Sequence, residues 1–203
     1  MDKLDSNKIS IGLCGGTFDP VHIMHLELAE AAYNYAKLDK VIFVPAGIPP
    51  HKHTVCAQPI HRYNMLALAL KGKDYFELSK YEIENCEPSY TVNTIKHFRE
   101  IYPSASIGLI LGYDTFLDVV NWYHAEEVIE MVDKFLVASR TLSNNENKKI
   151  SPILLNKTIF LPFQPRDISS HEIRALIKNG KAITGLVPPE VERYIYENGL
   201  YRD

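Results

Sequence analysis

Two histidines follow a pair of glycines near the start of the sequence, in the run Gly15-Gly16-Thr17-Phe18-Asp19-Pro20-Val21-His22-Ile23-Met24-His25. Glycine lets a backbone turn sharply and approach a ligand closely. On a helix that begins here, His22 and His25 share one side of the first turns. Unbonded N–H groups and the helix dipole favour an anion at that end. The pattern predicts a phosphate-binding turn, and its alternative is an ordinary helix cap with two surface histidines.

The residues between the glycines and the histidines indicate where the helix begins. Asp19 followed by Pro20 is a good N-cap and first helical residue. The apolar face we expect on this helix consists of Leu28, Ala31, Ala32 and Tyr35. The glycine spacing matches neither the Walker A loop nor GxGxxG, so a P-loop NTPase or a dinucleotide dehydrogenase is not supported.

Short apolar runs, typical of strands, alternate with longer helical patterns along the chain. The expected strands are 9–13, 41–44, 106–111 and 135–138, with a further one at 159–161. The expected helices are 21–37, 59–71, 91–101, 124–131, 169–179 and 188–198. This alternation predicts an open α/β fold with a parallel sheet, helices on both faces and a C-terminal helical segment. Ligands of such folds lie beyond the carboxyl ends of the strands.

Length and composition limit the other possibilities. The 203 residues fit one domain, 1–203, since a domain has roughly 100–200 residues. The formal net charge of −3 gives no basic excess that would attract nucleic acid. No apolar run approaches the roughly 20 residues of a membrane span, and the first ten residues lack a signal peptide's apolar stretch. Three widely spaced cysteines fit a reducing cytoplasm. We therefore expect a cytoplasmic protein with no nucleic-acid or membrane partner, and a homo-oligomer stays open.

Six motifs in order resemble one family. They are Gly15–His22 (the GGTFDPxH opening), Val44–Lys52, Pro88–Thr91, Gly112–Asp114 with Trp122, Ile168–Arg174 (like ISSTxIR), and Tyr194–Tyr201. Together they are similar to nucleotidyltransferases with an HxGH motif, most closely to bacterial nicotinate-nucleotide adenylyltransferases. The resemblance implies a Rossmann-like sheet and a reaction in which ATP and nicotinate mononucleotide give nicotinate adenine dinucleotide and pyrophosphate. Positioning and charge neutralisation would dominate catalysis, because the attacking phosphate is already an anion.

The resemblance assigns His22 and His25 to the phosphates around the reacting phosphorus, and Gly15, Gly16, Thr17 and Phe18 to ATP. Ser169 and Ser170 open a helix with Arg174 one turn along, a second anion cradle whose alternative is an ordinary capped helix. Lys52, after two prolines, would reach phosphate unless it is merely a solvated lysine. Arg140, after the fourth long strand, would face the same rim.

The remaining residues of the motifs would hold the mononucleotide. Gly112 and Asp114 would bind ribose hydroxyls, although Asp114 could also be the N-cap of a helix over 115–120. The single tryptophan, Trp122, would stack on the pyridine ring or pack in the core. Backbone N–H groups at Tyr90 and Thr91 would grip the nicotinate carboxylate at a helix start.

No metal site made of protein side chains is expected, because His51, His53, His61 and Cys56 show neither CxxC nor HExxH spacing. Mg²⁺ is implied instead, carried by the ATP phosphates and water.

The sequence departs from the family pattern at two positions. Met24 stands where the family usually has glycine or another small residue, and His171 replaces a threonine. These two changes leave open a catalytically weak nucleotide-binding module. Within the same chemistry, preference for nicotinamide mononucleotide and a phosphopantetheine-type adenylyltransferase also stay open. A phosphopantetheine enzyme would leave Pro88–Thr91 and Trp122 unexplained.

Overall fold

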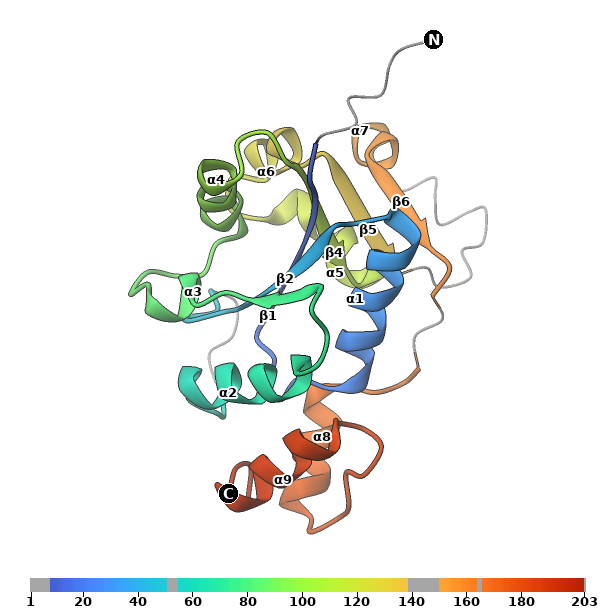
Figure 1. Cartoon of the computed structure of the whole chain (residues 1–203). Helices are drawn as coiled ribbons and strands as arrows, with labels where there is room; N and C mark the ends of the chain where they lie inside the picture. The colour runs from blue at the N-terminus through green and yellow to red at the C-terminus, as the bar shows by residue number, and fades with distance from the viewer. Residues whose placement is uncertain (1–7, 51–54, 139–149, 164–165, 203) are drawn as a thin grey trace.

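In the computed structural model, which describes residues 8–50, 55–138, 150–163 and 166–202, six strands form one parallel sheet. The strands are β1 (Ser10–Gly16), β2 (Lys40–Pro45), β3 (Phe76–Leu78), β4 (Ser106–Leu111), β5 (Lys134–Ala138) and β6 (Thr158–Leu161). Their order across the sheet is β3-β2-β1-β4-β5-β6 (Figure 1). The chain therefore builds outward from β1 in one direction and from β4 in the other, and the switch between them is where open sheets bind ligands.

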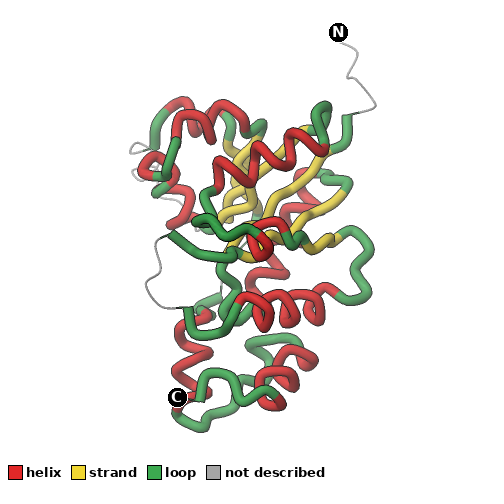
Figure 2. The backbone as a smooth tube through the Cα atoms, turned by 90° about the vertical axis from the view of Figure 1, so that its left-hand side faces the viewer, coloured by secondary structure: helices red, strands yellow, loops and turns green. Residues whose placement is uncertain are grey.

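Helices cover both faces of the sheet (Figures 1 and 2). They are α1 (Ile23–Ala36), α2 (Pro59–Leu70), α3 (Tyr81–Glu84), α4 (Thr91–Ile101), α5 (Tyr113–Leu117), the 3₁₀ turn η1 (Val119–Asn121), α6 (Ala125–Met131), α7 (Pro152–Asn156), α8 (Ser170–Lys178) and α9 (Pro189–Glu197). One buried cluster joins the sheet to α1, α2, α8 and α9, and a second joins it to α4, α5, α6 and α7. Apolar residues alternate between these clusters along β1, where Leu13 belongs to one and Cys14 to the other.

The predicted fold is confirmed: the sheet is parallel, helices lie on both faces, and two helices close the chain. The six expected helices and five expected strands all occur; 91–101 and 106–111 match at both ends, and the other ends differ by at most three residues. The alternative helix over 115–120 occurs as α5 and η1, whereas three short elements of the described residues escaped the sequence pattern, namely β3, α3 and α7. Each has three to five residues, too few to show a period of its own.

The predicted start of the first helix is wrong. The N-cap of α1 is His22, and Asp19 lies three residues earlier. The Asp19 carboxylate accepts hydrogen bonds from the backbone N–H groups of Cys56 (2.8 Å) and Ala57 (3.1 Å) instead of capping the helix. The predicted apolar face is wrong at Tyr35, which is 55% exposed, whereas Ala32 is buried and Leu28 packs against the same cluster. The buried face of α1 consists of Met24, Leu26, Ala29 and Ala32.

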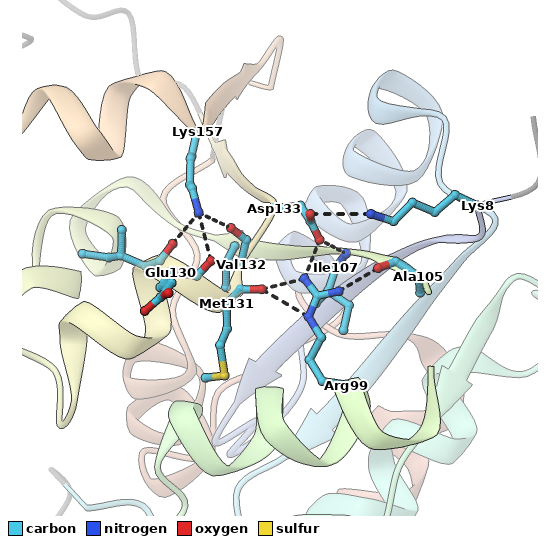
Figure 3. A network of polar contacts seen from close by, with 10 residues as sticks. Lys8, Arg99, Ala105, Ile107, Glu130, Met131, Val132, Asp133 and Lys157 are labelled. Atoms are coloured by element: carbon cyan, nitrogen blue, oxygen red, sulfur yellow. Dashed lines mark hydrogen bonds and ion pairs between the residues drawn. The ribbon is translucent and has the colours of Figure 1, made fainter. Parts of the chain in front are cut away.

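A polar network fixes the amino ends of β4 and β5, the edge of the sheet opposite the ligand edge (Figure 3). Lys157 donates to three carbonyls at the end of α6, those of Ile129, Glu130 and Val132. Arg99 pairs with Asp133 and also donates to the carbonyls of Met131 and Ala105. Asp133 accepts from the N–H of Ile107 at 2.8 Å. These hydrogen bonds join α4 and the end of α6 to the amino ends of β4 and β5.

The C-terminal helices pack beside α1 and α2 (Figures 1 and 2). The hydroxyl of Tyr194 in α9 lies 2.9 Å from Nδ1 of His61 and 3.0 Å from Nδ2 of Asn64, both in α2. The N–H of Ile23, the first residue of α1, donates to the carbonyl of Leu186 at 3.0 Å. The chain between α8 and α9 therefore contacts the helix start that carries the two histidines.

Candidate nucleotide site

A cavity of about 520 Å³ opens at the carboxyl ends of β1, β2 and β4. Its lining includes seven residues that the sequence analysis assigned to ligands: Gly15, Gly16, Thr17, Tyr90, Thr91, Asp114 and Trp122. The first three lie at the end of β1 and directly after it. The other four lie at the start of α4, in α5 and directly after η1. The topology thus places the residues predicted to bind ATP (Gly15–Thr17) and those predicted to bind ribose and nicotinate in the same cavity, at the switch point of the sheet.

The two histidines lie together at the N-terminus of α1. Their ring centroids are 3.7 Å apart, with 30° between the ring planes. The backbone N–H of His22 donates to Nδ1 of His25 at 3.2 Å. Because Nδ1 of His25 accepts this bond, the proton of the neutral ring belongs on Nε2. His25 can therefore present an N–H donor on the side away from the helix cap.

His22 is enclosed far more than a surface histidine. Its side chain is buried, with the residue 6% exposed. Burial lowers the pKa of His22 to about 4, so the ring is neutral at pH 7. Among the described residues, the Nδ1 atom of His22 has no hydrogen-bond partner although it is buried. The alternative of two plain surface histidines is therefore wrong for His22.

The aromatic ring of Phe18 supports this pair from inside. It packs edge-on against His25, with centroids 5.0 Å apart, and also contacts Phe43 of β2. The Phe18 side chain is 2% exposed. Any contact between Phe18 and a phosphate would thus come from its backbone, while its ring fixes the imidazole.

The start of α8 lies against the turn that carries the histidines. Arg174 donates from Nη1 to the carbonyl of Asp19 at 2.7 Å, and the hydroxyl of Ser170 donates to the carbonyl of Pro20 at 2.9 Å. Ser169 is the N-cap of α8, and its side chain accepts from the N–H of Glu172 at 3.2 Å. The fold therefore brings the second predicted anion cradle next to the first.

The other side of the cavity is aromatic and hydroxylic. Thr91 begins α4 with Tyr90 at its N-cap, as the sequence predicted. The Tyr90 ring packs on Tyr123, with centroids 4.3 Å apart. Trp122 is half-buried and lines the cavity, so part of the indole stays accessible to a flat ligand ring.

Asp114 is exposed beside the cavity, in the first turn of α5. The helix begins at Tyr113 with Gly112 as its N-cap, so the alternative role of Asp114 as N-cap is wrong. Gly112 itself follows the end of β4 directly. Both residues therefore stand at the carboxyl end of a central strand, which is compatible with ribose binding.

Several residues from the sequence analysis lie elsewhere. Lys52 and Arg140 lie outside the described residues, as do His51 and His53. Met24 is buried, with 7% of its surface exposed. His171 is exposed on α8.

Arg62 of α2 is a site-forming residue that sequence reasoning missed. It is completely buried, and its guanidinium donates to four backbone carbonyls: those of Thr17 (2.8 Å), Ala46 (2.5 Å), Gly47 (3.1 Å) and Ala57 (3.2 Å). These carbonyls belong to the loops that follow β1 and β2 and to the start of α2. Arg62 thus ties together the loops that border the cavity.

Glu82 is the second missed residue. It lies in α3, lines the cavity and is 8% exposed. Its carboxylate accepts from the hydroxyl of Thr94, while the hydroxyl of Ser89 accepts from the N–H of Gly47 at 3.0 Å. Burial raises the pKa of Glu82, and its hydrogen bonds to Thr94 and Ser89 oppose that rise. Neither Arg62 nor Glu82 stands in a motif that marks it, since their partners are distant in sequence.

Within the described residues, no three histidine, cysteine, aspartate or glutamate side chains gather as a metal site would require. Among the same residues, no helix combines the length and apolar character needed to cross a membrane. The three cysteines are free thiols.

Comparison with known proteins gives consistent results. A family model described as cytidylyltransferase-like matches residues 13–176. A probable nicotinate-nucleotide adenylyltransferase of Caldicellulosiruptor saccharolyticus is 37% identical, covering 96% of this chain and all of that protein. One of Clostridium tetani is 40% identical over 93% of this chain and 96% of its own length. The solved Plasmodium falciparum nicotinic acid mononucleotide adenylyltransferase complexed with NaAD has a TM-score of 0.78 at 22% identity, covering 95% of this chain and 97% of that chain.

Proposed function

The chain belongs to the cytidylyltransferase-like family, and from this premise we propose that it transfers the adenylyl group of ATP to nicotinate mononucleotide. The products are nicotinate adenine dinucleotide and pyrophosphate. Relatives named for this activity are similar over nearly the full chain. The proposal treats residues 1–203 as one domain, because α8 and α9 share a buried cluster with α1 and α2.

One observation supports the proposal most strongly: the starts of α1 and α8, whose side chains we assign to phosphate, meet at the β1–α1 turn, and Gly15, Gly16 and Thr17 just before that turn line the cavity. His22 and His25 stand at the start of α1, and Ser170 and Arg174 of α8 bond to the same turn. The cavity continues to the aromatic side at Trp122. This arrangement suits a ligand with a polyphosphate at one end and a flat ring at the other.

In the reaction, a phosphate oxygen of the mononucleotide forms a bond to the α-phosphorus of ATP. The bond from that phosphorus to the bridging oxygen of the β-phosphate breaks, and its electron pair leaves with pyrophosphate. The attacking phosphate is already ionised, so no side chain has to remove a proton. Catalysis then requires donors fixed around the α-phosphorus, where charge accumulates in the transition state.

His25 supplies such a donor through Nε2–H, because its Nδ1 is held by the N–H of His22. His22 contributes as a neutral ring, since burial lowers its pKa to about 4. The backbone of Gly15, Gly16, Thr17 and Phe18 supplies further N–H groups for the phosphates. Ser169, Ser170 and Arg174 would bind the β- and γ-phosphates, with Lys52 and Arg140 as additional predicted phosphate ligands.

The mononucleotide occupies the aromatic side of the cavity. Trp122 stacks on the pyridine ring, and the first N–H groups of α4 at Tyr90 and Thr91 bind the carboxylate. Gly112 and Asp114 bind ribose hydroxyls at the end of β4. This assignment is supported by the lining of the cavity, which includes Tyr90, Thr91, Asp114 and Trp122.

Mg²⁺ enters with ATP in this proposal. The groups at the two helix starts are imidazole, guanidinium and N–H donors, which suit phosphate oxygens and not a hard cation. The ion would therefore be held by ATP phosphates and water, and it would neutralise the charge of the departing pyrophosphate. We assign the reaction to the cytoplasm because the three thiols are free.

The test is pyrophosphate release from Mg²⁺-ATP with three acceptors: nicotinate mononucleotide, nicotinamide mononucleotide and phosphopantetheine. The expected result is turnover with the acid mononucleotide and much slower turnover with the other two. Faster turnover with the amide would contradict the role of Thr91. No turnover with any acceptor, together with ATP binding by calorimetry, would instead support a nucleotide-binding module.

A further inference from the structure

Asp19 joins three parts of the chain that are far apart in sequence. Its side chain accepts from the N–H groups of Cys56 and Ala57, just before α2, and from the hydroxyl of Tyr201 at 2.8 Å. Its own backbone carbonyl accepts from Arg174. Asp19 is 4% exposed, so these groups replace the water that a carboxylate would otherwise bind.

Tyr201 is held in an uncommon conformation to make this contact. Its φ angle is 64°, in the left-handed region that bulky side chains seldom adopt. The ring packs against the buried cluster shared by α1, α2, α8 and α9. Burial raises the pKa of the Tyr201 hydroxyl, and the charge of Asp19 raises it further. The hydroxyl therefore stays protonated and donates to Asp19.

The Asp19 carboxylate lies three residues before His22, in the turn between β1 and α1. The backbone carbonyls of this turn accept from α8, through Arg174 and Ser170, and the carboxylate accepts from Tyr201. The N–H of Ile23 is held by the carbonyl of Leu186. The segment from 170 to 201 thus makes four hydrogen bonds here: three at Asp19 and Pro20, before His22, and one at Ile23, between the two histidines.

We propose that Tyr201 is a positioning residue for catalysis: through its hydrogen bond to Asp19 it fixes the turn that places His22 and His25. The effect on catalysis rests on the proposed function, whereas the effect of Tyr201 on the position of the turn depends only on the fold. Tyr201 does not line the cavity that we assign to the substrates. Its removal therefore changes the rate of the chemical step more than the affinity for either nucleotide.

The test uses Tyr201→Phe, which removes one hydroxyl and keeps the ring. Tyr196→Phe is the matched control, because Tyr196 is 38% exposed on α9 and stands outside the turn. For Tyr201→Phe we expect kcat to fall on the order of tenfold, because a small displacement of reacting groups is costly. The KM values for both nucleotides should change less than about twofold. The control should keep the parent kcat.

Two further measurements separate positioning from simple loss of stability. The kcat is expressed per folded molecule, with the folded fraction measured by urea titration under assay conditions. In an Asp19→Ala background, which removes the acceptor, Tyr201→Phe should add no further loss, because the hydrogen bond no longer exists. An unchanged kcat per folded molecule in Tyr201→Phe, or an additive loss in the double variant, would overturn the proposal.

A readout without substrates keeps the inference separate from the proposed activity. The imidazole of His22 is titrated by NMR in the parent and in both tyrosine variants. Loosening the turn should admit water to His22 and move its pKa upward from about 4 in Tyr201→Phe alone. If the parent enzyme turns over none of the acceptors, the proposed function fails while this shift still supports the positioning role. Identical His22 titrations in parent and Tyr201→Phe would overturn that role.

Discussion

His25 uses its two ring nitrogens for different tasks, which substitutions can separate. Its Nδ1 accepts the N–H of His22 at 3.2 Å and completes the cap of α1. Its Nε2–H is the proposed donor to the α-phosphate. Replacing His25 with alanine removes both, so turnover should fall roughly 10²–10³-fold, about 3–4 kcal/mol of transition-state stabilisation. The free energy of unfolding should fall by about 1 kcal/mol for the lost hydrogen bond.

Two isosteric substitutions separate the loss of turnover from the loss of stability. The side-chain oxygen of asparagine reaches the position of Nδ1, so His25→Asn should keep the cap and its stability but lose turnover. The amide nitrogen of glutamine reaches the position of Nε2, so His25→Gln should recover part of the turnover while losing about 1 kcal/mol of stability. Turnover is measured as pyrophosphate release at saturating ATP and nicotinate mononucleotide, and stability by equilibrium urea unfolding.

The reasoning fails if His25→Asn turns over at the parent rate, because the Nε2–H donor would then be unnecessary. It also fails if all three variants lose stability and turnover in the same proportion. That result would mean that the imidazole acts only by packing against Phe18, with which it is in edge-on contact.

Three further predictions concern other residues. Arg62→Met should destabilise the fold by about 3–5 kcal/mol in urea unfolding, because four carbonyls lose a buried cationic donor; a loss below about 1 kcal/mol would show that water replaces it. Trp122→Ala should raise the KM for nicotinate mononucleotide roughly 2–30-fold while the KM for ATP stays unchanged; equal changes in both would refute stacking on the pyridine. Folding lowers the pKa of His22 from 6.5 to about 4, so between these pH values the folded protein binds fewer protons than the unfolded chain. The free energy of unfolding should therefore decrease by up to about 3 kcal/mol as the pH drops from 6.5 towards 4. The pH slope of unfolding should be shallower in His22→Asn, and equal slopes would contradict the burial of the ring.

The sequence predicted those parts of the site that depend on local spacing. His22 and His25 share a helix start because residues three apart do so on any helix. Ser169 caps α8 and Tyr90–Thr91 begin α4, as their residue types indicated. The strand ends then meet at the switch point because parallel topology requires it.

Contacts between distant segments were beyond the sequence pattern. Asp19 followed by Pro20 has the composition of a helix cap, but tertiary partners at residues 56, 57 and 201 take its carboxylate. The roles of Arg62 and Glu82 depend on backbone carbonyls and hydroxyls brought near them by folding. Local propensity carries no information about such partners. The same limit explains the buried face of α1, because the side of a helix that faces the core depends on its tertiary neighbours.

The hydrogen bond between Tyr201 and Asp19 spans 182 positions of the chain. During synthesis, Gly15, Gly16 and both histidines leave the ribosome long before Tyr201, which bonds to Asp19, has been translated. A nascent chain ending after β6 could pair all six strands, yet its β1–α1 turn would still lack the contacts made by residues 170–201. The geometry around His22 is therefore completed only after residues 170–201 have been translated.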